Sequence, residues 1–154
     1  MALNAGPALR RATLADIPQL LAIENLCFAG NRLGARNFRH MLRHAHGVTL
    51  VETCGGRLRG YVLLLFRSNS KLTRVYSIAT HPEHAGRGVA ARLLGAAEAL
   101  VREHGYTGQR LEIREDNRAS LSLFGAHGYR IFGRYPAYYH DGMDALRLEK
   151  TLSE

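Results

Sequence analysis

Residues 76–94 read YSIATHPEHAGRGVAARLL, and they decide the fold class because a short glycine-bearing loop joins a strand to a long helix. The strand is predicted over Arg74–Thr80, the loop over Pro82–Gly88 and the helix over Val89–His104. Two glycines in the loop allow its backbone to approach a ligand closely. The first turn of the helix adds unpaired N–H groups and a partial positive charge. The segment therefore favours an α/β protein with an anion site at the end of a strand.

The glycine spacing narrows the kind of anion site. Gly86 and Gly88 flank the cation Arg87, which suits a pyrophosphate. Neither G-x-G-x-x-G nor G-x-x-x-x-G-K-S/T occurs here, so the residues exclude a dinucleotide-binding fingerprint and a P-loop. A short glycine loop also starts many helices that bind nothing, and that interpretation stays open from the loop alone.

Working outward, hydrophobic spacing predicts the remaining elements. A capping box formed by Thr13 and Asp16 opens a first helix, and Asn117 is suited to cap the last one. The expected strands and helices outside the central segment are an edge strand at Ala8–Ala12, helices from Ile17 and around Phe38, a hairpin of Val48–Thr53 and Leu58–Phe66, a strand at Gln109–Arg114, a helix at Arg118–His127, and strands at Tyr129–Tyr135 and Ala145–Thr151. The order β-α-α-β-β-β-α-β-α-β-β predicts an α/β fold with a mixed sheet, because hairpins and crossovers alternate.

Composition sets the class of protein. The chain has 154 residues, 46% hydrophobic and 22% charged, which is typical of a globular protein and predicts a single domain over residues 1–154. The longest apolar run, Tyr61–Phe66, is far shorter than the ~20 residues of a membrane span. No secretory signal is visible at the start, and Cys27 and Cys54 form no disulfide framework. We expect a soluble, cytoplasmic protein, as a monomer or homodimer.

The net charge of +8 comes almost entirely from arginine, because the only lysines are Lys71 and Lys150. A basic surface favours polyanionic partners such as nucleic acid, the ribosome, acidic peptides or phosphorylated cofactors. Solvated arginines without any partner are an equal alternative at this point.

Residues 85–90 match Gln/Arg-x-x-Gly-x-Gly/Ala, the signature of the GCN5-related N-acetyltransferase family, except that Ala85 replaces the first residue. The resemblance extends to LEIREDNRASLSLFGAHGYRIFGRYPAYYHDGMDALRLEK at residues 111–150. It is clear over residues 74–150 and looser through Glu24 and Phe28. Within the family the chain resembles the branch of ribosomal-protein-alanine and protein N-terminal acetyltransferases.

The resemblance implies a mixed, partly antiparallel sheet of about six to seven strands with about four helices, in which two central parallel strands splay apart. It also implies acetyl-CoA as the acyl donor, lying in that opening. By match, backbone groups of one strand line the acetyl and pantetheine arm, and the loop and helix start hold the pyrophosphate. The residues so implied are Ile78, Ala79, Thr80, Gly86, Arg87, Gly88, Val89, Ala90, Ala91, Asn117 and Phe124.

The resemblance further assigns an acid and a base. Glu112 matches the glutamate that acts as general base, although an ion pair with Arg110 or Arg114 on the same face is the alternative. Phe124 stands where the branch has a tyrosine that protonates the leaving thiolate. Because phenylalanine has no proton to give, either the reaction tolerates the loss of this acid, or water or another tyrosine takes the role. Tyr139 and Tyr129 are the candidate tyrosines.

The acceptor side is implied by two further segments. Tyr138-Tyr139 matches a hairpin that covers the substrate backbone in N-terminal acetyltransferases, while a purely structural hairpin is the alternative. The region Phe28–Arg36 would form the opposite wall. An N-terminal α-amine is the preferred acceptor, since its pKa of about 7.7–8.0 lies far below the ~10.4 of lysine.

Histidines and cysteines offer no competing chemistry in the sequence. His40 and His44 lie one helical turn apart, with His46 nearby, but no carboxylate or cysteine close in sequence completes a metal site. We therefore expect no metal and exposed helix histidines. Cys27, beside Phe28, is interpreted as a small buried residue.

The sequence thus predicts an acetyl-CoA-dependent N-acetyltransferase that moves the acetyl group directly to a primary amine. The alternatives are acetylation of a small-molecule amine or a lysine side chain, and a non-catalytic module that binds acyl-CoA or nucleic acid. The last is favoured by Phe124, Ala85 and the net charge.

Overall fold

Every strand and helix expected from the sequence forms in the computed structural model, which describes residues 6–28, 32–44 and 46–152. Predicted boundaries differ from the observed ones by at most two residues. In chain order the elements are β1 (Ala8–Arg11), η1 (Leu14–Asp16), α1 (Ile17–Cys27), α2 (Ala35–Arg43), β2 (Gly47–Cys54), β3 (Arg57–Phe66), β4 (Leu72–Thr80), η2 (Pro82–His84), α3 (Val89–Glu103), β5 (Gly108–Arg114), α4 (Arg118–Ala126), β6 (Arg130–Tyr135) and β7 (Ala145–Thr151). The short 3-10 turns η1 and η2 were not predicted.

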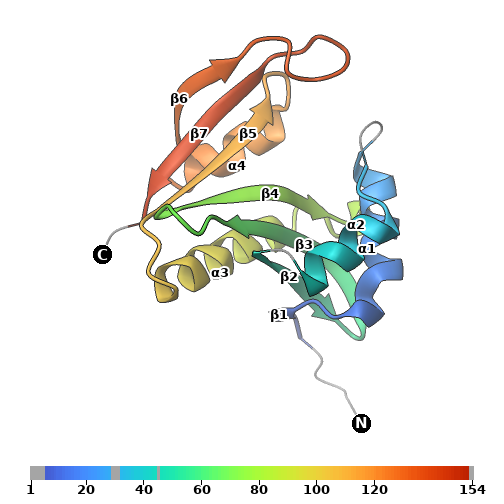
Figure 1. The fold of residues 1–154 in the computed structure, drawn as a ribbon. Coiled ribbons are helices and arrows are strands. Elements are labelled where there is room, and N and C mark those ends of the chain that lie inside the picture. The colour runs from blue at the N-terminus through green and yellow to red at the C-terminus, as the bar shows by residue number, and fades with distance from the viewer. Residues whose placement is uncertain (1–5, 29–31, 45, 153–154) are drawn as a thin grey trace.

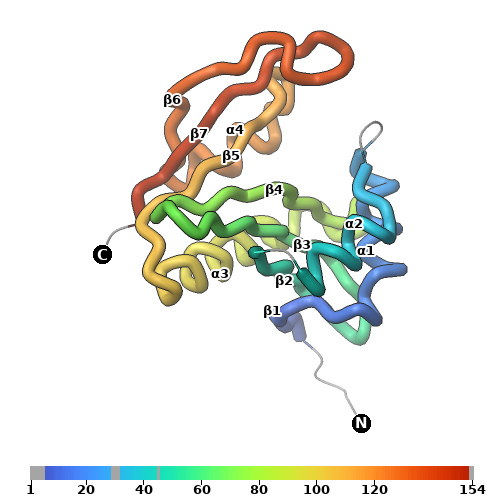
Figure 2. The backbone as a smooth tube through the Cα atoms, viewed as in Figure 1, coloured from blue at the N-terminus to red at the C-terminus, as the bar shows by residue number. Residues whose placement is uncertain are grey.

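The described strands form one mixed sheet in the order β1-β2-β3-β4-β5-β7-β6. Its neighbours pair antiparallel except for β4 and β5, which run parallel. Pairing between these two strands covers only Leu72–Arg74 with Gly108–Arg110. Beyond that point the strands diverge, so that the sheet opens into two halves (Figure 2). The expected splay of two central parallel strands is therefore confirmed.

The helices cover the two faces of the sheet unequally (Figure 1). α3 and α4 pack on one face over the larger core, which includes Leu64 of β3, Leu93 of α3 and Leu111 of β5. α1 and α2 pack on the other face, against Tyr61 of β3 and Ala79 of β4. Their contacts lie on the β2–β4 half. The same face of β5, β7 and β6 has no helix over it among the described residues, and it stays open beside the splay (Figure 1).

The first helix begins and ends as physical chemistry predicts, with one exception. The Asp16 carboxylate accepts the Thr13 N–H at 2.7 Å and pairs with Arg10 at 2.8 Å, which confirms the capping interaction. The prediction of a buried Cys27 is wrong, because its side chain is exposed at the end of α1. Its Sγ donates to the Thr80 carbonyl at 3.2 Å. The helix buries Ile23 instead.

None of the helices in the described part of the chain is both long and apolar enough to span a bilayer.

A buried polar network ties α3 to the second half of the sheet. The Glu98 carboxylate accepts the Tyr129 hydroxyl at 2.9 Å and the Lys150 ammonium at 2.9 Å. The Tyr129 hydroxyl in turn accepts from Gln109 Nε2 at 2.8 Å. Glu98 is 5% exposed and Gln109 is fully buried, so water offers these groups no alternative partner. The two halves of the sheet are joined by few hydrogen bonds, so this network attaches α3 to the half formed by β5, β6 and β7.

We expect Glu98→Ala to lower the free energy of unfolding by about 2–3 kcal/mol, because it leaves a buried hydroxyl and a charged ammonium without their acceptor. The measurement is urea denaturation followed by circular dichroism. Glu103→Ala is the matched control, since Glu103 is an exposed carboxylate at the end of the same helix and is expected to change stability by less than about 0.5 kcal/mol. Equal midpoints for the two variants would contradict the role given to Glu98.

Candidate active site

The loop between β4 and α3 has the backbone geometry of an anion cradle. Gly86 and Gly88 both adopt φ of 78°, a left-handed conformation that favours glycine. Gly88 is the N-cap of α3 and offers no side chain, so the first N–H groups of the helix have no capping acceptor in the described chain. A Cβ built on Gly86 meets nothing within 4 Å, which leaves that side of the loop open to a ligand. The residues present therefore fit a bound pyrophosphate.

Positive charge surrounds the same loop. Arg87 lies within 3.4 Å of His84 Nδ1, and partial burial together with the charges of Arg59 and Arg87 lowers the pKa of His84. Arg92, in the first turn of α3, donates from Nε and Nη2 to the fully buried Glu52 at 2.7 and 3.0 Å. Arg59 lies 3.6 Å from the same carboxylate. Glu52 thus fixes two guanidinium groups next to the loop, and no local sequence pattern indicated this buried charge.

We expect Gly88→Ala to weaken acetyl-CoA binding about tenfold, because a left-handed conformation costs a residue with a Cβ roughly 1–2 kcal/mol. The new Cβ would also lie 2.9 Å from Arg92 Nη1 and displace that guanidinium. Isothermal titration with acetyl-CoA measures the effect. Gly95→Ala is the control, since a Cβ on this exposed α3 glycine meets nothing within 4 Å and should leave the affinity unchanged. Unaltered affinity in Gly88→Ala would contradict the cradle.

The splayed end of β4 provides the backbone expected to line the acyl arm. A bulge opposite Leu63 and Leu64 leaves Tyr76 without a register partner on β3. Beyond it, Ile78 packs toward the α3 core while Ala79 packs toward α1. Thr80 ends the strand. Because β5 no longer pairs with this segment, its backbone faces the opening rather than a neighbouring strand.

Glu112 lies on the open face of β5, with 11% of its side chain exposed. Its Oε1 is 2.5 Å from Arg74 Nη2 on β4, so the alternative pairing with Arg110 or Arg114 is wrong. Arg110 pairs with Glu149 at 3.1 Å instead. Burial alone would lower the pKa of Arg74, but the charge and hydrogen bond of Glu112, together with those of Tyr138, outweigh it and raise that pKa. The ion pair with Arg74 fixes the position of this carboxylate next to the splay.

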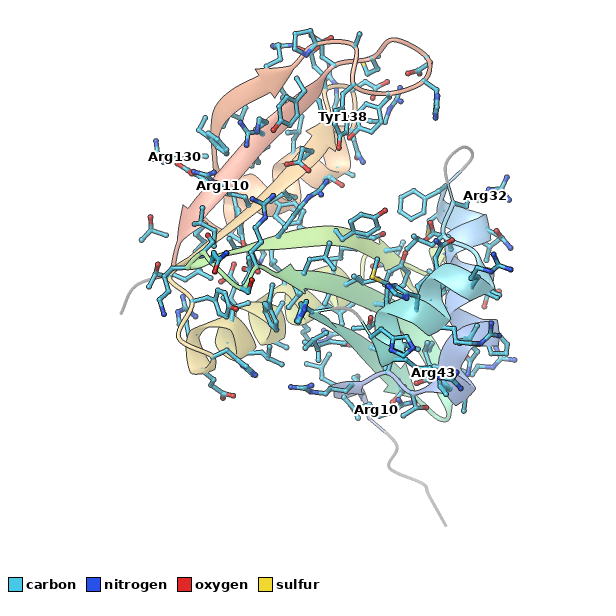
Figure 3. The ribbon with its side chains drawn as sticks, in the orientation of Figure 1. Arg10, Arg32, Arg43, Arg110, Arg130 and Tyr138 are labelled. Atoms are coloured by element: carbon cyan, nitrogen blue, oxygen red, sulfur yellow. The ribbon has the colours of Figure 1, made fainter. Side chains whose placement is uncertain are left out.

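The loop between β6 and β7 brings two tyrosines to the open face of the sheet near Arg74 and Arg114. Tyr138 lies on the loop between β6 and β7 and is 46% exposed (Figure 3). It stacks on Tyr135 and accepts from Arg74 Nη2 at 3.5 Å. The guanidinium of Arg114 lies 5.0 Å from the ring centre of Tyr139. Burial raises the pKa of Tyr139, and the neighbouring charges of Tyr138 and Glu112 raise it further. Tyr139 therefore keeps its proton at neutral pH and is available as a donor.

Salt bridges hold this loop on β5. Arg114 pairs with Asp141 at 2.8 Å and with Asp116 at 3.1 Å. The Arg114 hydrogen bond lowers the pKa of Asp141 to about 2, so the pair stays ionised at neutral pH. The aromatic hairpin thus has a defined place beside Glu112.

The helix α4 contributes less to the opening than expected. Phe124 is 1% exposed and packs edge-on against Tyr129 at 5.1 Å, so its ring offers almost no surface to the acyl donor. Tyr129 is 5% exposed, with its hydroxyl committed to Glu98 and Gln109. Of the two tyrosines considered as acid, Tyr139 alone lies on the open face. Asn117 caps α4 by accepting the Ser120 N–H at 3.1 Å, and its exposed position leaves it accessible.

The opposite wall begins where α1 ends. Phe28 is half-buried against the α1 core, and residues 29–31 lie outside the described residues. Glu24 organises this wall: it is 2% exposed, accepts the Leu33 N–H at 2.8 Å, and accepts the Tyr61 hydroxyl. Tyr61 also contacts Ser77 Oγ at 2.9 Å. The tyrosine that binds Glu24 comes from β3, which is distant in sequence.

The histidines give no metal centre in the described chain. His40, His44 and His46 are exposed, as expected for helix and loop histidines. No group of three histidine, cysteine or carboxylate side chains gathers closely enough to hold a metal ion among the described residues.

Comparisons with known proteins identify the family of the chain. The sequence model of the acetyltransferase (GNAT) family matches residues 17–129, and the chain belongs to that family. It is 32% identical to the catalytic subunit NAA10 of the N-terminal acetyltransferase A complex of Arabidopsis thaliana, over 94% of this chain and 77% of the relative. It is 30% identical to the N-alpha-acetyltransferase RimI of Mycobacterium tuberculosis, over 90% of this chain and 88% of the relative.

Solved structures share the fold. Ard1 from Thermoplasma volcanium superimposes with a TM-score of 0.88 at 22% identity, covering 96% of this chain and 99% of the other. The putative acetyltransferase yncA from Salmonella typhimurium, solved with acetyl-CoA, gives 0.81 at 23% identity and covers 98% and 96%. The protein is therefore an N-acetyltransferase that uses acetyl-CoA.

Proposed function

We propose that the acceptor is a protein N-terminal α-amine, acetylated directly within a complex of enzyme, acetyl-CoA and peptide. The observation that carries this proposal is the position of Arg74, which contacts both Glu112 and Tyr138. It joins the candidate base to the hairpin that, by resemblance, covers a peptide backbone. The relatives named NAA10 and RimI are described as N-terminal and N-alpha-acetyltransferases, which supports the same acceptor.

In this proposal each group of the chain has one task. The loop and first turn of α3, from Gly86 to Ala91, hold the pyrophosphate, and Asn117 adds a contact. The backbone of Ile78, Ala79 and Thr80 lines the acyl arm, and N–H groups there stabilise negative charge on the carbonyl oxygen. Acetyl-CoA supplies the acetyl group.

Proton transfer is assigned to two side chains on the open face. Glu112 accepts the proton of the attacking amine, and the Tyr139 O–H donates a proton to the departing sulfur. Phe28 and Tyr138 form the two walls between which the first residues of the peptide lie. An α-amine is already partly neutral at pH 7, whereas lysine would require far more deprotonation.

The test is release of CoA thiol with three acceptor sets: peptides with free N-termini and no lysine, lysine peptides with blocked N-termini, and polyamines. Turnover confined to free N-termini is the expected result. Turnover with blocked lysine peptides or with polyamines, but not with free N-termini, would overturn the proposal and assign the site to ε-amines or small amines. Mass spectrometry of the product locates the acetyl group.

A further inference from the structure

A cavity rich in arginine lies on the open face of the sheet beside Glu112. Its volume is about 250 Å³, and its lining comes from β4, β5, β6, β7 and the loops between β3 and β4 and between β6 and β7. The lining contains four arginines, Arg67, Arg74, Arg110 and Arg147, but a single carboxylate, Glu112. Arg110 and Tyr138 mark its two sides on the β5–β7 half of the molecule (Figure 3).

The strand register places one of these cations next to the candidate base. Glu112 on β5 is the direct register partner of Arg147 on β7. Directly opposite residues in an antiparallel pair have Cβ atoms about 4.5–5.5 Å apart and side chains on the same face. The guanidinium of Arg147 therefore lies on the same open surface as the Glu112 carboxylate.

Two of the four arginines of the lining, Arg67 and Arg147, form no ion pair with a carboxylate among the described residues. Arg74 pairs with Glu112, and Arg110 pairs with Glu149. Arg147 instead lies over two rings, 4.7 Å from the centre of Phe132 and 4.5 Å from that of Tyr135. Its Nε is buried without a hydrogen-bond acceptor in the described part of the chain. A stacked guanidinium with unused donors is preorganised to bind a carboxylate.

We propose that this cavity binds an acidic side chain of the acceptor, within its first two residues, through Arg147. The inference rests on the proposed function and specifies its substrate class. Since Arg147 neighbours Glu112, the bound carboxylate lies within a residue or two of the reacting amine.

The experiment compares matched peptides that carry Asp or Asn at position 1 or at position 2, at saturating acetyl-CoA. The intact enzyme is expected to prefer the Asp peptide by about 10- to 100-fold in kcat/KM, as one charge-assisted hydrogen-bonded pair provides. Arg147→Gln should abolish this preference while turnover of the Asn peptide stays within a few-fold. Arg147→Lys, which keeps the charge but not the planar fork, should retain part of it.

Arg43→Gln is the matched control, because it removes the same charge from the exposed end of α2, away from the cavity (Figure 3). It should keep the full preference for Asp. Thermal denaturation establishes that each variant is folded. A preference for Asp that survives in Arg147→Gln, or equal use of Asp and Asn peptides by the intact enzyme, would overturn the inference.

Two further measurements separate this inference from the proposed function. Calorimetric binding of the Asp peptide in the presence of CoA, lost in Arg147→Gln but without any turnover, would support the cavity and refute the proposed reaction. Free 2,4-diaminobutyrate carries its own carboxylate, whereas its amide does not. The two compounds therefore test whether the cavity binds the carboxylate of a small-molecule acceptor instead of a peptide side chain. Acetylation of the free acid but of no peptide would overturn the assignment to a peptide side chain.

Discussion

Glu112→Gln is expected to lower kcat/KM for a free N-terminal peptide by about 10²–10³-fold, within the range that a positioned general base contributes. Glutamine keeps the size of the side chain and a carbonyl oxygen near Arg74, but it cannot accept the proton of the amine. The loss should be largest near neutral pH and shrink as the pH rises above the amine pKa of about 7.7–8.0, where the acceptor is already neutral. Steady-state kinetics between pH 6.5 and 9.5 measure both effects.

Glu149→Gln is the matched control for this variant. Glu149 lies on the adjacent strand, on the same face, and pairs with Arg110 and Arg130 rather than with the reacting groups. It should change kcat/KM by no more than a few-fold. An unchanged rate and pH profile in Glu112→Gln would remove Glu112 from the mechanism and leave it as the ion-pair partner of Arg74.

Tyr139→Phe is expected to reduce kcat by about 10²-fold, because it removes the proton donor assigned to the departing thiolate. The raised pKa of Tyr139 keeps the hydroxyl protonated over the working range, so the loss should be nearly constant with pH. Single-turnover measurements separate the chemical step from product release.

The neighbouring tyrosine provides the comparison. Tyr138→Phe removes a hydroxyl that contacts Arg74, not one assigned to the leaving group, so it should raise KM for the peptide and leave kcat nearly unchanged. If instead Tyr139→Phe affected only KM, the acid would be a water molecule and both tyrosines would serve to bind the peptide.

Much of the fold was predictable from local signals in the sequence. The positions of glycines and the spacing of hydrophobic residues predicted every helix and strand. Such signals are local: helix capping, as by Thr13, Asp16 and Asn117, involves residues within one or two helical turns. The splay between β4 and β5 was not derivable from such patterns. It was expected only from the family resemblance, since local periodicity carries no information on where a parallel pairing stops.

The site was predictable where it rests on one segment and not where it joins distant ones. The glycine loop and Glu112 were identified from the sequence, but the ion-pair partners considered for Glu112, Arg110 and Arg114, were wrong. The actual partner, Arg74, lies on another strand, and only the pairing of β4 with β5 brings the two together. The same holds for Arg147, whose place beside Glu112 depends on the β5–β7 pairing. Cys27 was misplaced because its position at the last turn of α1 leaves it beyond the packed core.

The pair of Lys150 with Glu98 has a chemical consequence for an enzyme that works with a reactive thioester. The chain has only two lysines, and Lys150 Nζ donates to the buried Glu98 carboxylate at 2.9 Å. Arginine, which supplies nearly all other positive charge, stays protonated in proteins and is a poor nucleophile toward acyl groups. Lys71 is therefore the one exposed ε-amine open to self-modification. The basic surface of this acetyltransferase is thereby protected from losing its charge to its own acyl donor.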